Sequence, residues 1–143
     1  MLSILFAIIS GISMTLQGVF NTNLEKDLGT WETNLLSQGS AFVITLLIVF
    51  LFGKGNLKAV KDVNKIYLLS GVLGVIIIFT VIKSIGSMGT TVGIGVILVA
   101  QLLSAGIVDA FGLFGSDKVT FNINEFIGIS IMIFGIIIFK WKF

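Results

Sequence analysis

The chain has 143 residues, of which 56% are hydrophobic and only 11% charged, and its mean hydropathy is +1.13. A soluble domain carries about 25% charged residues, so this composition excludes a soluble enzyme domain, a nucleic-acid-binding module and a disordered tail. The net charge is only +2, and the nine basic residues are all lysines, mostly at the ends of apolar segments. We interpret them as topology signals and interface anchors, and expect no nucleic-acid partner.

Five apolar segments follow one another along the chain. Each is close to the roughly 20 residues that a helix needs to cross the hydrocarbon core of a bilayer. The first has no positively charged region before it and no small-x-small cleavage site, so we expect a retained span and no signal peptide. The composition and spacing predict an all-α integral membrane protein, one domain with five transmembrane helices. The expected spans cover residues 1–20, 31–52, 66–82, 92–114 and 121–139.

Polar segments separate the expected spans and predict the loops of the protein. The segment at 53–65 is the longest and carries four lysines against one aspartate. Aromatic residues at span ends favour the headgroup region, which is where Trp31, Tyr67 and Trp141 are expected. The other expected loops cover residues 21–30, 83–91 and 115–120.

The lysines give little bias in orientation. An odd number of spans puts the termini on opposite sides of the membrane, with five lysines on the N-terminal side and four on the other. Orientation follows the lysine excess on the cytoplasmic side, and an excess of one is small. Two alternatives are open: a single N-in orientation that another feature fixes, or dual topology with two copies paired antiparallel. We favour the second, which gives a ten-helix inverted repeat of the kind found in secondary transporters.

The first expected span carries a polar stripe. At 100° per residue, Ser13, Gln17 and Asn21 fall on one face together with Ser3 and Ser10. Polar groups in lipid need partners, so this face should meet other helices or a water-filled cavity. The serines favour helix packing. For the larger Gln17 and Asn21 we favour cavity lining, with hydrogen bonds between helices as the alternative.

The second and fourth spans repeat this pattern. Asn34, Gln38 and Thr45 share a face of the second, and Gln38 is a candidate for substrate binding or for interhelical hydrogen bonding. In the fourth, Gln101 and Asp109 share a face, and Gln101 is a further candidate for lining the pathway.

Asp109 is the only acidic residue expected deep in a span. It lies about six residues, or roughly 9 Å, from the centre of that span. A carboxylate at this depth is a functional-site hypothesis, and we assign it coupling or gating. The alternatives are an interfacial aspartate that reaches water, or one neutralised by a structural partner such as Lys83 of an antiparallel copy. Lys83 closes its own span, where snorkelling to the interface is expected.

The fifth span begins with polar residues and carries glycines along one face. Asn122 or Asn124 can cap the helix, and Glu125 in the first turn suits the helix dipole. Gly128 and Gly135, seven residues apart, indicate a contact with another helix and no binding wall.

The sequence contains neither Cys nor His. Thiolate nucleophiles, zinc–thiolate sites and the commonest general base are therefore excluded. With no visible nucleophile–base arrangement, we expect no enzyme, no catalytic residue, no metal and no cofactor.

Two runs of the sequence carry a resemblance to a known family: LQGVFNTNLEKDLGTWETNLLSQGS (16–40) and TTVGIGVILVAQLLSAGIVDAFGLFG (90–115). With the five expected spans, they resemble the small five-helix, YdcZ-type branch of the drug/metabolite transporter superfamily. The chain departs from the family pattern at Lys83-Ser84, where Pro-Arg is frequent, and at Ala100, where Gly is frequent. The resemblance implies a bacterial inner-membrane transporter fold built from antiparallel halves that occur as single, paired or fused units. It implies no particular substrate.

We therefore expect a multi-pass inner-membrane transporter that moves a small molecule by alternating access as an antiparallel homodimer, with proton or cation coupling. Its site would be lined by Gln17, Asn21, Gln38 and Gln101, with Asp109 as the coupling or gating residue. The alternatives are a lipid flippase or scramblase and a structural membrane subunit without cargo.

Overall fold

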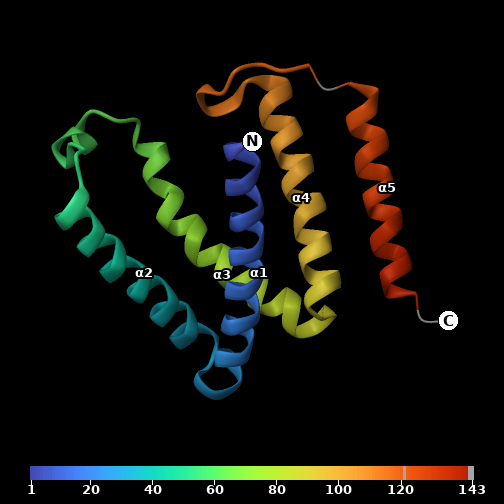
Figure 1. The fold of residues 1–143 in the computed structure, drawn as a ribbon, viewed down its shortest axis with the longest axis horizontal. Coiled ribbons are helices and arrows are strands. Elements are labelled where there is room, and N and C mark those ends of the chain that lie inside the picture. The colour runs from blue at the N-terminus through green and yellow to red at the C-terminus, as the bar shows by residue number, and fades with distance from the viewer. Residues whose placement is uncertain (121, 142–143) are drawn as a thin grey trace. The chain divides into compact units, whose positions relative to one another are not determined.

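The computed structural model describes residues 1–120 and 122–141, and these residues form helices without any strand, as the sequence predicts (Figure 1). Five of the helices are long and apolar enough to cross a membrane. They are α1 (Leu2–Leu28), α2 (Thr30–Phe52), α3 (Ser70–Met88), α4 (Thr90–Phe111) and α5 (Ile123–Lys140). The third span begins before α3, at Lys65, because a 3₁₀ helix leads directly into it. Three short 3₁₀ helices, η1 (Leu57–Lys61), η2 (Lys65–Leu69) and η3 (Leu113–Gly115), lie in the connections.

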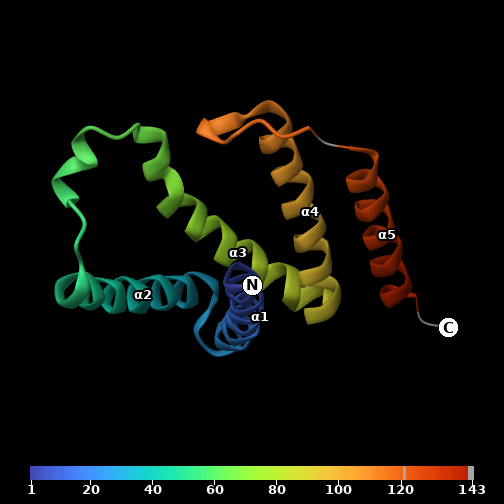
Figure 2. The same cartoon turned by 45° about the horizontal axis from the view of Figure 1, so that its top comes forward.

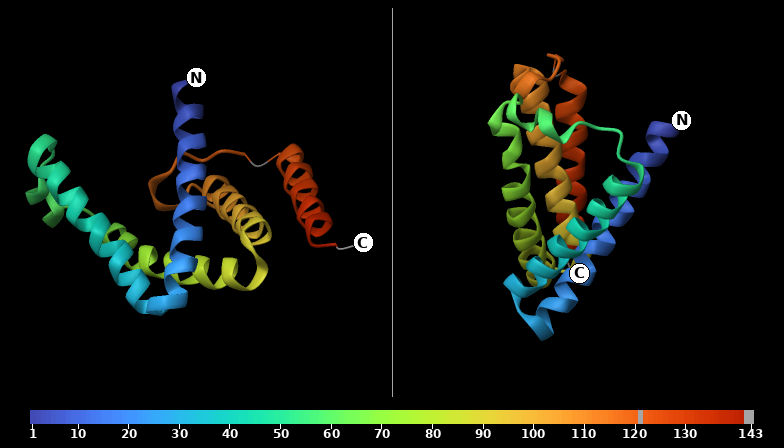
Figure 3. Two further views of the ribbon diagram at one scale, coloured as in Figure 1. Left: turned by 60° about the horizontal axis from the view of Figure 1, so that its bottom comes forward. Right: turned by 90° about the vertical axis from the view of Figure 1, so that its left-hand side faces the viewer.

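The chain divides into two compact units, Met1–Lys83 and Ser84–Phe143, with the boundary inside α3. In the first unit, α1 and α2 diverge from a shared tight turn, which is clear in Figure 1 and in the left panel of Figure 3. In the second unit, α4 and α5 run antiparallel beside one another, as Figures 1 and 2 both show.

Most apolar side chains on these helices are exposed. Among the described residues, the buried apolar side chains are Ile78, Ile82, Ile85, Val99 and Ile129. A soluble chain could not keep its remaining Leu, Ile and Phe side chains in water, whereas lipid tails are as apolar as leucine. The exposed faces are therefore lipid-facing surfaces, and small residues and polar groups hold the helices together.

The first helix extends further than the sequence suggested. The loop expected at 21–30 is instead helical through Leu28, and Gly29 alone separates α1 from α2. Residues 21–28 contain neither Gly nor Pro, and the Thr22 hydroxyl donates to the Gly18 carbonyl within the helix at 2.8 Å. Polarity here marks where the helix leaves the hydrocarbon region, while the helix itself ends where Gly29 turns the backbone with φ 96°.

The later helix ends follow the same rule. The turn expected at 83–91 is mostly helical, because α3 continues to Met88 and Gly89 alone precedes α4. The α4 helix ends at Phe111, three residues before the expected end at 114, because Gly112 adopts the left-handed conformation. The α5 helix begins at Ile123, and the expected start of that span at Phe121 lies outside the described residues.

The α1–α2 turn predicts a test of the fold. At φ 96° and ψ 161°, Gly29 occupies a region that is essentially restricted to glycine. Gly29→Ala should therefore lower the free energy of unfolding by about 1–3 kcal/mol. The measurement is unfolding of purified protein in mixed micelles by titration with sodium dodecyl sulfate.

Gly11→Ala is the matched control. Gly11 lies in α1, and a Cβ there meets nothing within 4 Å. This substitution should leave stability unchanged or raise it by up to about 1 kcal/mol through helix propensity. Equal destabilisation by both substitutions would contradict the conformational role of Gly29.

Candidate functional site

A groove of about 520 Å³ lies between α1 and α2 in the first unit. Ser13, Gln17 and Asn21 line its α1 side at successive four-residue steps, and Ser37 and Ser40 lie on its α2 side. The structure therefore places three of the five residues of the polar stripe in a groove, whereas Ser3 and Ser10 do not line it. Its remaining lining residues are Leu16, Phe20, Leu24 and Leu36.

Gln17 and Asn21 differ in their surroundings. Gln17 is exposed in the groove, whereas Asn21 is only 5% exposed. The Asn21 amide donates to the Ser37 hydroxyl at 3.4 Å, a long hydrogen bond that joins α1 to α2. Asn21 thus serves helix packing as well as lining the groove, while Gln17 is the more available of the two to a solute.

Gln38 and Asn34 lie at the contact between α2 and α3. The Asn34 amide is buried and donates to the Val75 carbonyl of α3 at 2.8 Å. Gly74 leaves room for the Gln38 side chain, since a Cβ at position 74 would lie 2.7 Å from Gln38 Nε2. Gln38 does not line the groove with Gln17, and its surroundings are those of a packed helix contact.

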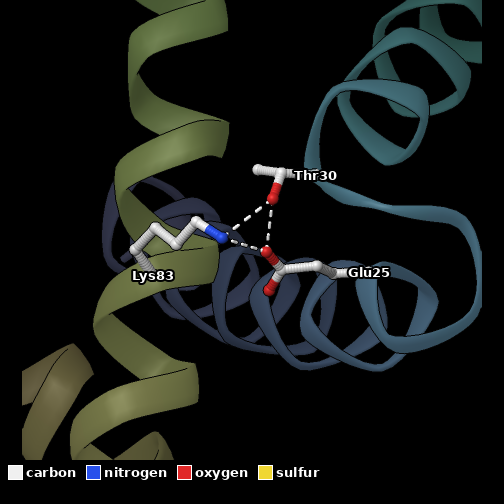
Figure 4. Close-up of polar contacts among 3 residues, drawn as sticks. All are labelled: Glu25, Thr30 and Lys83. Carbon is white, nitrogen blue, oxygen red and sulfur yellow. Dashed lines mark hydrogen bonds and ion pairs between the residues drawn. The ribbon is translucent and has the colours of Figure 1, made fainter.

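A second polar cluster joins the end of α1 to α2 and α3, and Figure 4 shows its three members. Glu25 of α1 forms an ion pair and hydrogen bond with the Lys83 ammonium of α3. The Thr30 hydroxyl, at the start of α2, donates to Glu25 Oε1 at 2.5 Å and accepts from Lys83 Nζ at 2.8 Å. One carboxylate therefore links three helices.

Aromatic rings pack beside this cluster. Trp31 and Phe79 are stacked, with ring centroids 5.0 Å apart and planes at 20°. The Lys83 ammonium lies 5.9 Å from the Phe79 centroid, within cation–π range. The side chain of Lys83 is 53% exposed, as snorkelling requires, but it also has a carboxylate partner in its own chain.

A hollow of about 330 Å³ lies between α4 and α5 in the second unit. Asp109, two residues before the end of α4, and Glu125, in the first turn of α5, both line it. The connection between these helices returns over its end, where the Val119 amide donates to the Asp109 carbonyl at 2.9 Å. The other lining residues are Leu102, Ala105, Gly106, Val119, Thr120, Gly128, Ile129 and Met132.

This hollow revises the sequence interpretation of α5. The helix was expected to form a contact only, yet Glu125, Gly128, Ile129 and Met132 line a hollow. Asn122 is the N-cap of α5 and Glu125 lies in the first turn, as predicted. Glu125 also takes part in a capping box, which was not predicted: its Oε2 accepts from the Asn122 backbone amide at 2.8 Å.

The predicted site residues are brought together only in part. Gln17 and Asn21 share the α1–α2 groove, Gln38 lies at the α2–α3 contact, and Asp109 lines the α4–α5 hollow. Gln101 is exposed on α4 and lines neither space. Within the described ranges, no group of three or more acidic side chains could hold a metal ion.

Sequence reasoning missed Glu25 and the second role of Glu125. The Glu25–Lys83 pair joins residues 58 positions apart, so no local pattern could reveal it. A signal for Glu125 was present: the short connection from α4 to α5 brings the end of one helix near the start of the other, and hence Asp109 near Glu125.

Five membrane-length helices, lipid-facing apolar surfaces and polar residues gathered between helices define a multi-pass membrane protein. The chain belongs to the family whose model is described as "Putative inner membrane exporter, YdcZ", which matches residues 2–138. It is therefore a multi-pass protein of the inner membrane, from a family of membrane transporters. No curated protein and no solved structure matches the chain.

The Glu25–Lys83 pair predicts a non-additive effect of substitution. Glu25→Gln and Lys83→Met should each lower the free energy of unfolding, because each leaves one partner without its counter-charge. The double variant should be less destabilised than the sum of the two, with a coupling on the order of 1 kcal/mol or less because Lys83 is largely exposed. Unfolding in mixed micelles measures all three variants.

Lys26→Met is the control for net charge. Lys26 lies next to Glu25 in α1 but bonds to the Asn23 side chain instead. Combined with Glu25→Gln, it should give additive effects. If the effects of Glu25→Gln and Lys83→Met on the free energy of unfolding are also additive, the Glu25–Lys83 pair contributes nothing to stability.

Proposed function

We propose that the chain exports a small molecule by alternating access as an antiparallel homodimer. The single observation that carries this proposal is the groove between α1 and α2, whose Gln17 and Asn21 place amide groups within a membrane-length helix. Family membership supports the same function. In this proposal the solute binds in the groove. Rocking of the helices then opens the groove to one side of the membrane and afterwards to the other.

Each polar residue has a defined part in the proposal. Gln17 offers an amide that can donate to and accept from a solute, and Asn21 orients the wall through Ser37. Gln38 supports the α2–α3 contact against which the groove moves. Gln101 is exposed on α4 and stays a candidate for lining the pathway in the dimer. Asp109 is the coupling or gating carboxylate, supported by its exposed side chain near the end of α4.

Dual topology accounts for how one chain forms an inverted repeat. The five-to-four division of lysines supports it, because so small a bias does not select one orientation. Two antiparallel copies place equivalent grooves in opposite orientations, which is the symmetry that alternating access uses in proteins with inverted repeats.

A single cysteine tests the topology directly, since the chain has no native cysteine. Gly55→Cys, at a position where an added Cβ meets nothing within 4 Å, should react with a membrane-impermeant maleimide from both sides of the membrane. Adding two lysines to the 53–65 loop should drive labelling to one side. Labelling of the unmodified loop from one side only would contradict dual topology.

Asp109→Asn tests the coupling role, because it preserves shape and removes the charge. We expect proteoliposomes with the native chain to take up at least one member of a panel of radiolabelled amines, amino acids and sugars when a pH gradient is imposed. The variant should remain dimeric on gel filtration and lose the response to the gradient.

Asp62→Asn is the matched control, since Asp62 follows η1 outside the expected spans. It should transport as the native chain does. An Asp109→Asn variant that retains the full response to pH would remove Asp109 from the coupling role. A variant that no longer dimerises would assign it a structural role instead.

A further inference from the structure

We propose that the hollow between α4 and α5 binds an amphiphilic organic monocation, with the charged head between Asp109 and Glu125 and the apolar body along the helices. This site is separate from the α1–α2 groove, so the proposal goes beyond the proposed function: it adds a second ligand site and names the chemical class of its ligand. The argument uses the shape of the hollow, its charge and the residues that keep it open.

The hollow has one charged end and one apolar end. Asp109 and Glu125 lie where α4 ends and α5 begins, with Thr120 of the connection beside them. Leu102 is seven residues before Asp109, and Met132 is seven residues after Glu125. Since an α-helix rises about 1.5 Å per residue, the apolar walls extend roughly 10 Å from the carboxylates. A ligand with a polar head and an apolar body matches this gradient.

The charge of the hollow selects the sign of the ligand. Two carboxylates line it, and no cationic side chain does so among the described residues. In the connection above it, Asp117 and Lys118 are neighbours of opposite charge, and neither lines the hollow. The C-terminal end of α4 adds partial negative charge, while Glu125 offsets the partial positive charge at the start of α5. An organic cation is therefore favoured over an anion or a neutral solute.

Small residues keep the hollow open. Ala105 and Gly106 on α4 face Gly128 across it, and a Cβ added at Gly128 would meet nothing within 4 Å. A larger side chain at position 128 can therefore enter this space without clashing with the backbone. The size, about 330 Å³, suits one small organic molecule.

Binding is measured by isothermal titration calorimetry on the purified chain in neutral detergent, with benzyltrimethylammonium as the cation and benzenesulfonate as the anion of similar size. The native protein should bind the cation saturably and the anion not at all. Gly128→Leu should fill the hollow and weaken cation binding at least about tenfold. Gly135→Leu is the matched control, because position 135 is on the same helix, is equally open and lines no part of the hollow.

The charge is tested separately. Glu125→Gln keeps the capping bond that glutamine can also accept, so α5 should stay intact. It should weaken cation binding about tenfold, as should Asp109→Asn, since each removes one of two attractive charges. Asp117→Asn should bind as the native chain does. These variants keep the proposal testable if Gly128→Leu does not fold.

Several outcomes would overturn the inference. Equal binding of both ions, or unchanged cation binding in Gly128→Leu and in the two carboxylate variants, would show that the hollow is not the site. A change in oligomeric state by Gly128→Leu without loss of cation binding would assign the hollow to contact with a second copy. Because binding is measured without transport, a chain that binds the cation but moves no solute contradicts the proposed function and leaves the site standing.

Discussion

The structure depends on one constraint: a polar group inside a membrane needs a partner, because lipid offers none. Backbone groups meet this constraint within the helices, so the polar side chains decide where helices meet. In the first unit, Asn34 donates to the α3 backbone, Asn21 to Ser37, and Glu25 joins Thr30 and Lys83. Thr33, which is fully buried, has no hydrogen-bond partner for its hydroxyl among the described residues. The Asn21–Ser37 contact also forms part of the wall of the α1–α2 groove, in which Gln17 remains available.

The helical architecture could be predicted from the sequence, because each apolar segment has about the length that a helix needs to cross the hydrocarbon core of a bilayer. The helix ends could not be placed from polarity alone. Residues 21–28 are polar yet helical, since the helix can leave the hydrocarbon region without losing its hydrogen bonds. Glycine with positive φ, at positions 29, 89 and 112, is the physical signal that ends these helices. The glycines at positions 29 and 89 therefore mark the α1–α2 and α3–α4 turns better than the polar segments do.

The candidate site was predictable where it depends on one helix and unpredictable where it depends on two. Gln17 and Asn21 share a face by helical periodicity alone, and the groove contains both. Asp109 was selected for its expected depth in the span, whereas α4 ends two residues after it, and Glu125 joins it in lining one hollow because of how α4 and α5 pack. Lys83 was assigned to the interface by its position, whereas its carboxylate partner lies 58 residues away and required the tertiary structure. Family membership supports a membrane transporter.

The central claim is that the α1–α2 groove is a water-filled pathway and not a lipid-facing seam. Reactivity of single cysteines with a membrane-impermeant thiol reagent tests it most directly, with no substrate required. Gln17→Cys lies in the groove, and Phe42→Cys lies on a lipid-facing part of α2 where the native side chain is 66% exposed. The account predicts that the cysteine at position 17 reacts in intact membranes while the one at position 42 does not. Equal absence of reaction at both positions would contradict a water-filled groove and favour a structural role for the polar stripe.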